Sequence, residues 1–133
     1  MNWYKKLLIM SVVSSFTPGA MACTSSDSIK TVSAPVFSNA VSHPAVQVVD
    51  VRDATEYAEG HIEGSVNLNV NSADFVEKAN TALRKSEPVY VYCRSGKRSL
   101  KAAELLAKEG YMVINLDNGI LGWEKDGFPV VKD

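Results

Sequence analysis

The chain has 133 residues, which corresponds to a single domain; 46% of the residues are hydrophobic and 22% are charged. These fractions are typical of a folded globular protein and exclude a disordered or fibrous chain. The formal net charge is −1. A chain with nearly equal numbers of acidic and basic residues lacks the positive charge that nucleic-acid binding requires, so nucleic acid is not expected as a partner.

The first 22 residues have the pattern of a secretory signal peptide. Two lysines precede the mostly apolar run 7–16, which is too short to anchor the chain stably in a bilayer. A proline and a glycine at 18–19 interrupt the run, and Ala-Met-Ala at 20–22 supplies the small residues of a cleavage site. A buried N-terminal helix is the alternative. Removal of residues 1–22 would leave 12 basic and 15 acidic residues, a formal charge of −3.

Residues 23–29 are rich in serine and threonine, and we interpret them as a polar linker. Cys23 directly follows the expected cleavage site, as does the lipidated cysteine of bacterial lipoproteins, which the pattern resembles. Ala20, however, stands where lipoproteins carry a large aliphatic residue, so soluble export is the favoured interpretation. We expect a periplasmic protein that contacts a membrane only if Cys23 is lipidated.

Residues 30–133 are expected to form the one folded domain. Stretches rich in valine, typical of buried strands, alternate with stretches of helical periodicity. This alternation predicts βαβ units, a parallel sheet and an α/β fold. Strands are expected at 46–51, 65–68, 89–92 and 112–116, and helices at 35–42, 55–58, 72–85, 99–109 and 120–125.

Two of these helices show clear boundaries and an apolar stripe. Asn71 or Ser72 is the expected N-cap of the helix at 72–85, and Gly110 is the expected left-handed residue that ends the helix at 99–109. The stripe expected to face the core in the second helix consists of Leu100, Ala103, Leu106 and Ala107.

Cys93 ends the predicted strand 89–92 and precedes the helix 99–109. Ligands of α/β sheets bind at the carboxyl ends of the strands, and the following helix would direct free N–H groups at the thiol. A glycine and three cations accompany Cys93, and consecutive N–H groups in such a loop bind anions. These surroundings predict a nucleophilic thiolate at Cys93 rather than an inert core cysteine. The remaining loop residues expected to bind substrate are Arg94, Ser95, Gly96, Lys97, Arg98 and Ser99.

Two chemistries use this arrangement of strand, cysteine, loop and helix. A cysteine phosphatase needs an arginine six residues after the cysteine to bind the phosphoryl group in bidentate fashion. Residue 99 is a serine, and Arg98 comes one residue early. The shorter loop therefore favours a small sulfur anion over a phosphoryl ester.

Several motifs together resemble those of the single-domain rhodaneses, which are sulfurtransferases. The resemblance covers about residues 30–130, and its motifs are Val49-Asp50-Val51-Arg52, Glu56-Tyr57, Gly60-His61-Ile62, Gly64 to Asn67, the loop CRSGKRS from Cys93 to Ser99, and Gly119 to Trp123 before Gly127-Phe128-Pro129. Asn118 departs from the family, whose members commonly carry a second glycine there. The resemblance implies a central parallel sheet of about five strands with helices on both faces.

The resemblance also implies a reaction in two steps. The Cys93 thiolate takes a sulfur atom from thiosulfate or a related donor and becomes a persulfide, and cyanide or a thiol then accepts that sulfur. Loop N–H groups would hold the charge of the terminal sulfur, while Arg94, Lys97 and Arg98 would attract the donor. No metal or organic cofactor is expected. The alternatives are an arsenate reductase or cysteine phosphatase of related fold and a non-catalytic module that senses sulfide.

Residues outside the loop receive structural interpretations. Asp50 and Arg52 either support the active loop or, as we favour, form an ion pair, with Glu56 as a further partner, that fixes their own turn. His61 is interpreted as a hydrogen-bonded structural residue, because a preformed thiolate needs no base. Trp123 and Phe128 are expected in the core.

Overall fold

A computed structural model of the protein describes residues 28–132. The predicted signal peptide, Cys23 and all but the last two residues of the predicted linker lie outside the described residues. Within residues 28–132, no helix combines the length and the apolar character that crossing a membrane requires.

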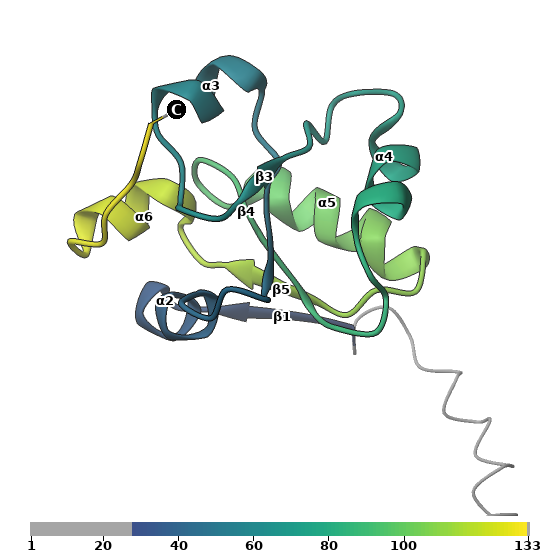
Figure 1. The fold of residues 1–133 in the computed structure, drawn as a ribbon, viewed down its shortest axis with the longest axis horizontal. Coiled ribbons are helices and arrows are strands. Elements are labelled where there is room, and N and C mark those ends of the chain that lie inside the picture. The colour runs from purple at the N-terminus through teal and green to yellow at the C-terminus, as the bar shows by residue number, and fades with distance from the viewer. Residues whose placement is uncertain (1–27, 133) are drawn as a thin grey trace, which may run out of the picture.

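The centre of the domain is a sheet of five parallel strands in the order β1-β5-β4-β2-β3 (Figure 1). The strands are β1 (Ile29–Val32), β2 (Gln47–Asp50), β3 (Val66–Asn67), β4 (Val89–Tyr92) and β5 (Val113–Leu116). The predicted five-stranded α/β architecture is confirmed. Because Asp50 pairs with Tyr92, the segments that follow β2 and β4 leave the same edge of the sheet side by side.

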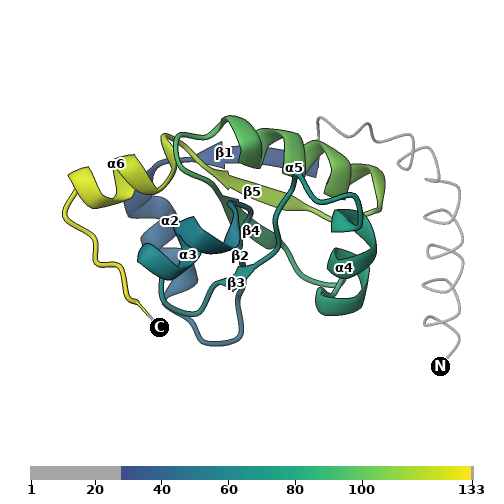
Figure 2. The same ribbon diagram turned by 90° about the horizontal axis from the view of Figure 1, so that it is seen from above.

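Helices cover both faces of this sheet, as expected. Figures 1 and 2 show α4 (Phe75–Ala82) and α5 (Lys97–Lys108) on one side of the strands. On the other side lie α2 (Ala34–Val41), α3 (Ala54–Glu59) and α6 (Gly119–Lys125). The right-handed crossovers of parallel strands favour this two-sided arrangement.

Alternation along the strands builds a separate core on each face. Val89 and Val91 of β4 belong to the cluster that contains Phe75 of α4 and Leu106 of α5. Tyr92, the next residue along, belongs to the opposite cluster with Phe37, Leu116 and Trp123. Successive side chains of a strand point to opposite faces, so a strand covered by helices on both sides is apolar throughout.

Several details differ from the sequence-based expectations, and α5 begins at Lys97, two residues earlier than expected. β1 was not predicted, and Ile29, assigned to the linker, is its first residue. Helix α4 begins at Phe75 rather than at residue 72, and Asp74, not Asn71 or Ser72, precedes it; the Ser72 hydroxyl instead donates to the Asp74 carboxylate. Leu100 is 43% exposed, because the buried face of α5 consists of Ser99, Ala102, Ala103 and Leu106.

Candidate functional site

The sulfur of Cys93 lies where β4 ends and the loop to α5 begins. Gly96, the residue before α5, adopts φ +113°, a conformation that glycine permits and other residues rarely adopt. This turn directs the Gly96 N–H back at the cysteine, and it donates to Cys93 Sγ at 3.0 Å. A donor at the start of a helix, aimed at a sulfur, is suited to stabilising negative charge on that sulfur.

Cys93 is more buried than a nucleophile was expected to be. Its exposed fraction is 1%, and it packs in the core cluster that contains Val51, Val70 and Ala103. Within the described part of the chain it is a free thiol with no disulfide partner. This burial is what an inert core cysteine would also show, whereas the N–H donor of Gly96 is the feature that the thiolate prediction requires.

The start of α6 holds the loop from the other side. The N–H groups of Ile120 and Leu121 donate to the carbonyl oxygens of Cys93 and Arg94, at 2.9 and 3.1 Å. A Cβ atom on Gly119 would lie 2.3 Å from the Arg94 oxygen, so only glycine permits this approach. Asn118, which departs from the family pattern, still adopts the left-handed conformation, with φ +64°. Asparagine tolerates that region, so the turn keeps its shape.

The predicted loop residues gather around Cys93, but one of the cations is already engaged. Arg94, Ser95 and Lys97 are exposed, whereas Ser99 is buried and donates its hydroxyl to the Gly96 carbonyl at 3.1 Å. Arg98 donates from both terminal nitrogens to the Glu56 carboxylate, at 2.8 and 2.9 Å. The expectation that Arg98 attracts the donor stays a prediction, and the structure adds that its guanidinium is paired with Glu56.

Glu56 reaches Arg98 from the first turn of α3. This helix begins with a capping box, in which Asp53 accepts from the Glu56 N–H and Glu56 accepts from the Asp53 N–H. The hydrogen bonds from Arg98 lower the pKa of Glu56 to about 2. Those bonds also raise the pKa of Arg98, and attraction to Cys93 adds to the effect. The capping box is readable from Asp53 and Glu56, but the contact between α3 and α5 has no signal in a single sequence.

Asp50 and Arg52 form a buried ion pair of their own. Arg52 Nη2 lies 2.6 Å from Asp50 Oδ2 and also donates to the Gly60 carbonyl at 2.7 Å. The Arg52 N–H donates to Asp50 Oδ1, which closes the turn after β2. The favoured ion-pair interpretation is confirmed for these two residues. Glu56 is not hydrogen-bonded to Arg52, because its carboxylate binds Arg98 instead.

The histidine and tryptophan singled out in the sequence are structural. His61 is buried and stacks on Tyr57 with ring centroids 3.7 Å apart, and its Nδ1 lies 2.8 Å from the Tyr57 carbonyl oxygen. Trp123 is buried in the core, and its indole N–H donates to the Pro129 carbonyl. Both interpretations are confirmed.

Comparison with known proteins identifies the family of the chain that carries this loop. The family model described as a rhodanese-like domain matches residues 33–126. The chain belongs to the rhodanese-like domain family. The match covers both neighbouring turns, after β2 and after β4, together with the contact that α6 makes with the active loop.

Relatives carry names that support a sulfurtransferase. The chain is 38% identical over 91 residues to the thiosulfate sulfurtransferase GlpE of Pseudomonas fluorescens, covering 67% of this chain and 80% of the relative. It is 33% identical over 107 residues to the putative sulfur carrier protein YrkF of Bacillus subtilis, covering 79% of this chain. The match spans 56% of the length of YrkF.

A solved structure shows the same fold. The crystal structure of a rhodanese-related protein from Thermoplasma volcanium superimposes with a TM-score of 0.70 at 29% sequence identity. The alignment covers 78% of this chain and 99% of that one.

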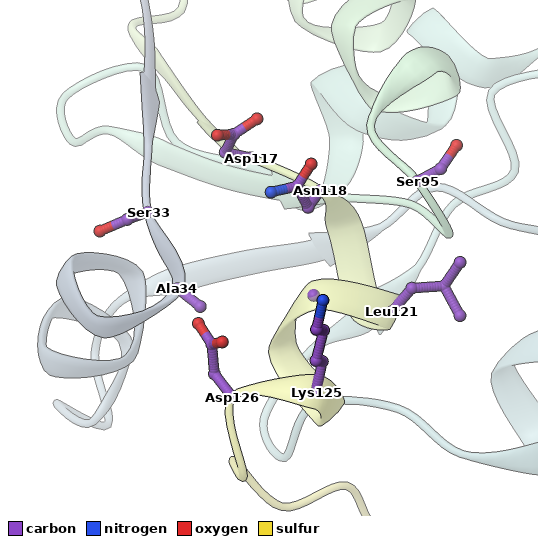
Figure 3. Close-up of a pocket in the computed structure, with 9 residues that line it drawn as sticks. Ser33, Ala34, Ser95, Asp117, Asn118, Leu121, Lys125 and Asp126 are labelled. Carbon is purple, nitrogen blue, oxygen red and sulfur yellow. The ribbon is translucent and has the colours of Figure 1, made fainter.

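Two hollows lie beside the loop of this rhodanese-like domain. One, of about 480 Å³, opens between the ends of β1 and β5 and helix α6; Asn118, Lys125 and Asp126 border it, and Ser95 lines it from the loop (Figure 3). The other is a cleft of about 160 Å³ between α3 and α6, which Glu56, Glu59 and Arg94 help to line. Cys93 lines neither of the two. Within residues 28–132, no cluster of three histidine, cysteine or acidic side chains is arranged to hold a metal ion.

Proposed function

We propose that this protein is a sulfurtransferase that moves a sulfane sulfur from thiosulfate or a related donor to cyanide or a thiol through a persulfide on Cys93. The observation that carries the proposal is the N–H group of Gly96, which donates to Cys93 Sγ at the end of β4. The thiosulfate sulfurtransferase name of a relative with 38% identity supports the choice of donor.

The chemistry needs two displacements at sulfur. The Cys93 thiolate attacks the outer sulfur of thiosulfate, the bond between the two sulfur atoms of the donor breaks, and sulfite leaves with the electron pair. The enzyme then carries a Cys93 persulfide anion. Cyanide attacks the outer sulfur of that persulfide and leaves as thiocyanate, which regenerates the thiolate. Charge balances in both steps, and no proton must be moved.

Loop residues have separate roles in this proposal. The N–H groups from Arg94 to Ser99 stabilise the charge of the terminal sulfur, with the Gly96 N–H already in place. The exposed side chains of Arg94 and Lys97 raise the local concentration of the donor anion. Asp50 and Arg52 act indirectly, by fixing the neighbouring turn.

The position of Arg98 argues against a phosphatase or arsenate reductase. These reactions require an arginine free to bind an oxyanion through two nitrogens, and here both terminal nitrogens of Arg98 bind Glu56. Residue 99, where the longer loop would supply that arginine, is a buried serine.

Thiocyanate formation from thiosulfate and cyanide tests the proposal. The protein should turn over many times, and Cys93→Ser should reduce the rate by roughly 10³-fold or more, because the nucleophile is lost. A matched control is Ser86→Ala, which changes an exposed side chain before β4 and outside the loop, and which should retain most of the activity. An active Cys93→Ser protein, or one round of sulfur uptake without transfer, would contradict the proposal. Hydrolysis of a phosphate ester or reduction of arsenate would favour the alternatives.

We further propose that the protein is exported after removal of residues 1–22 and acts in the periplasm. The basic start, the apolar run and the Ala-Met-Ala sequence support this. Cell fractionation combined with N-terminal sequencing of the mature protein tests it. A soluble periplasmic form that begins at Cys23 agrees with unmodified export. Membrane association lost in Cys23→Ser would indicate lipidation, and an uncleaved cytoplasmic chain would refute export.

A further inference from the structure

The pairing of Arg98 with Glu56 restricts what the positive loop can bind. Arg98 is the second residue of α5 and follows by two positions Gly96, whose N–H donates to Cys93 Sγ. A guanidinium next to a cysteine loop is well suited to binding a tetrahedral oxyanion through two nitrogens. In this protein both terminal nitrogens instead bind the carboxylate oxygens of Glu56.

Glu56 is held so that it competes with any such anion. Its N–H donates to Asp53 Oδ1 at 2.9 Å, and its Oε1 accepts from the Asp53 N–H at 3.2 Å. The Glu56 and Arg98 side chains are 24% and 30% exposed, so water screens the pair only in part. Because the capping box already restrains Glu56, the pair forms with a smaller loss of side-chain freedom than an unrestrained glutamate would incur.

The cleft beside the pair carries charges of both signs. It has a volume of about 160 Å³, lies between α3 and α6, and its charged lining residues are Arg52, Arg94, Glu56, Glu59 and Glu124. With Glu56 ionised, three carboxylates therefore line the cleft together with two guanidinium groups. Without the charge of Glu56 the lining is balanced, and Arg98, which now binds Glu56, would be a further cation available to an anion.

We propose that Glu56 determines the anion selectivity of the loop by occupying Arg98, so that free tetrahedral oxyanions such as phosphate and arsenate are excluded while the outer sulfur of a sulfane donor still reaches the N–H groups around Cys93. The inference rests on the proposed sulfurtransferase function for the identity of the accepted donor. Glu56 is a positioning residue in this account, because it acts through Arg98 and does not touch the reacting sulfur.

Glu56→Gln tests the proposal, because glutamine can preserve the capping box while it removes the charge. Calorimetric titration with inorganic phosphate at low salt should show affinity about tenfold higher than in the unchanged protein, the size expected for a newly available bidentate charge-assisted contact. Glu59→Gln is the matched control, since Glu59 lies on the same helix and lines the same cleft. It removes the same charge and should change phosphate affinity by less than about twofold.

A double variant identifies the group responsible. Glu56→Gln combined with Arg98→Gln keeps the net charge of the unchanged protein and should return phosphate affinity to within about twofold of it. Equal gains in Glu56→Gln and Glu59→Gln would reduce the effect to general charge and overturn the proposal, as would a gain that survives in the double variant. If Glu56→Gln does not fold by circular dichroism, Arg98→Gln decides alone: it should leave phosphate affinity within about twofold of the unchanged protein, and a larger loss would mean that Arg98 already binds anions there and would overturn the proposal.

Inhibition of thiosulfate turnover by phosphate provides a second measurement, which would not change if Glu56 had only a structural role. Phosphate should become a competitive inhibitor of thiosulfate in Glu56→Gln, at concentrations about tenfold below those that affect the unchanged protein. Phosphate binding does not require turnover. A protein that binds phosphate as expected but transfers no sulfur would therefore refute the proposed function and leave the selectivity inference standing.

Discussion

Two adjacent turns at the carboxyl edge of the sheet use charged residues in opposite ways. After β2, Asp50 and Arg52 are both buried and satisfy each other, and Arg52 also binds the Gly60 carbonyl. After β4, the cations Arg94 and Lys97 are exposed, and the loop directs an N–H group at a sulfur. The charges of the first turn are already paired within the turn, whereas the cations of the second remain exposed to solvent. Both turns contain arginine, and the difference between them is whether the charged side chains already have a partner within the protein.

The largest effect is expected from breaking the closed turn. Asp50→Asn should lower the free energy of unfolding by about 3–5 kcal/mol, because it leaves the buried guanidinium of Arg52 without its counter-charge. Denaturant unfolding measures this. The matched control is Glu87→Gln, which breaks the exposed ion pair with Arg84 and should cost less than about 1 kcal/mol. Equal losses in the two variants would show that the Asp50–Arg52 pair is not the structural element described here.

A smaller effect is expected where α6 meets the active loop. Gly119→Ala should destabilise the protein by about 2–4 kcal/mol, because the left-handed conformation and the clash with the Arg94 carbonyl act together. Thiosulfate turnover should fall as well, since the loop must shift to make room. Gly64→Ala is the control: Gly64 has φ +87° but open space around it, so only the conformational cost of about 1–2 kcal/mol applies. If both variants lose the same stability, the close approach of α6 does not position the loop.

The link between α3 and α5 predicts a pH dependence of stability. Folding lowers the pKa of Glu56 from 4.5 to about 2, so its contribution is complete above pH 4.5 and is lost as the pH falls toward 2. Over this window the free energy of unfolding should fall by about 1–2 kcal/mol more in the unchanged protein than in Glu56→Gln, a value reduced for the partial exposure of the pair. Parallel curves for the two proteins would mean that the pair contributes no stability.

The smallest effect is expected at the exposed cations of the open loop. Arg94→Gln and Lys97→Gln should each raise the KM for thiosulfate by about two- to fivefold, through a weaker attraction of the donor anion. The increase should shrink at high salt, because exposed charges are screened. Lys101→Gln, one turn further along α5 and also exposed, should change KM less. A KM effect that is independent of ionic strength would indicate direct contact with the donor rather than steering.

The sequence predicted the local geometry of the loop well wherever the signal came from neighbouring residues. Eight consecutive residues contain the strand 89–92, Cys93, and Gly96, whose N–H donates to the cysteine sulfur. Neighbouring residues alone were therefore enough to place the loop. The ion pair of Asp50 and Arg52 was readable for the same reason, because only two positions separate them.

Contacts between distant segments were missed or assigned to the wrong partner. Glu56 and Arg98 are 42 positions apart, and nothing in a single sequence shows that α3 and the start of α5 meet at one edge of the sheet. β1 escaped prediction because an edge strand of four residues with an exposed middle lacks a clear apolar pattern. The burial of Cys93 could not be read either, since it depends on how α5 and the segment around Val70 close over the sheet.

The most direct test of the central claim is the intact mass of the protein after incubation with thiosulfate. We expect a gain of one sulfur atom that a reducing thiol removes, that cyanide removes with release of thiocyanate, and that is absent in Cys93→Ser. A folded protein with a free Cys93 thiol that gains no sulfur from thiosulfate or from other sulfane donors would refute sulfur transfer through Cys93. The loop after β4 would then have to be reconsidered as a binding site rather than a site of sulfur transfer.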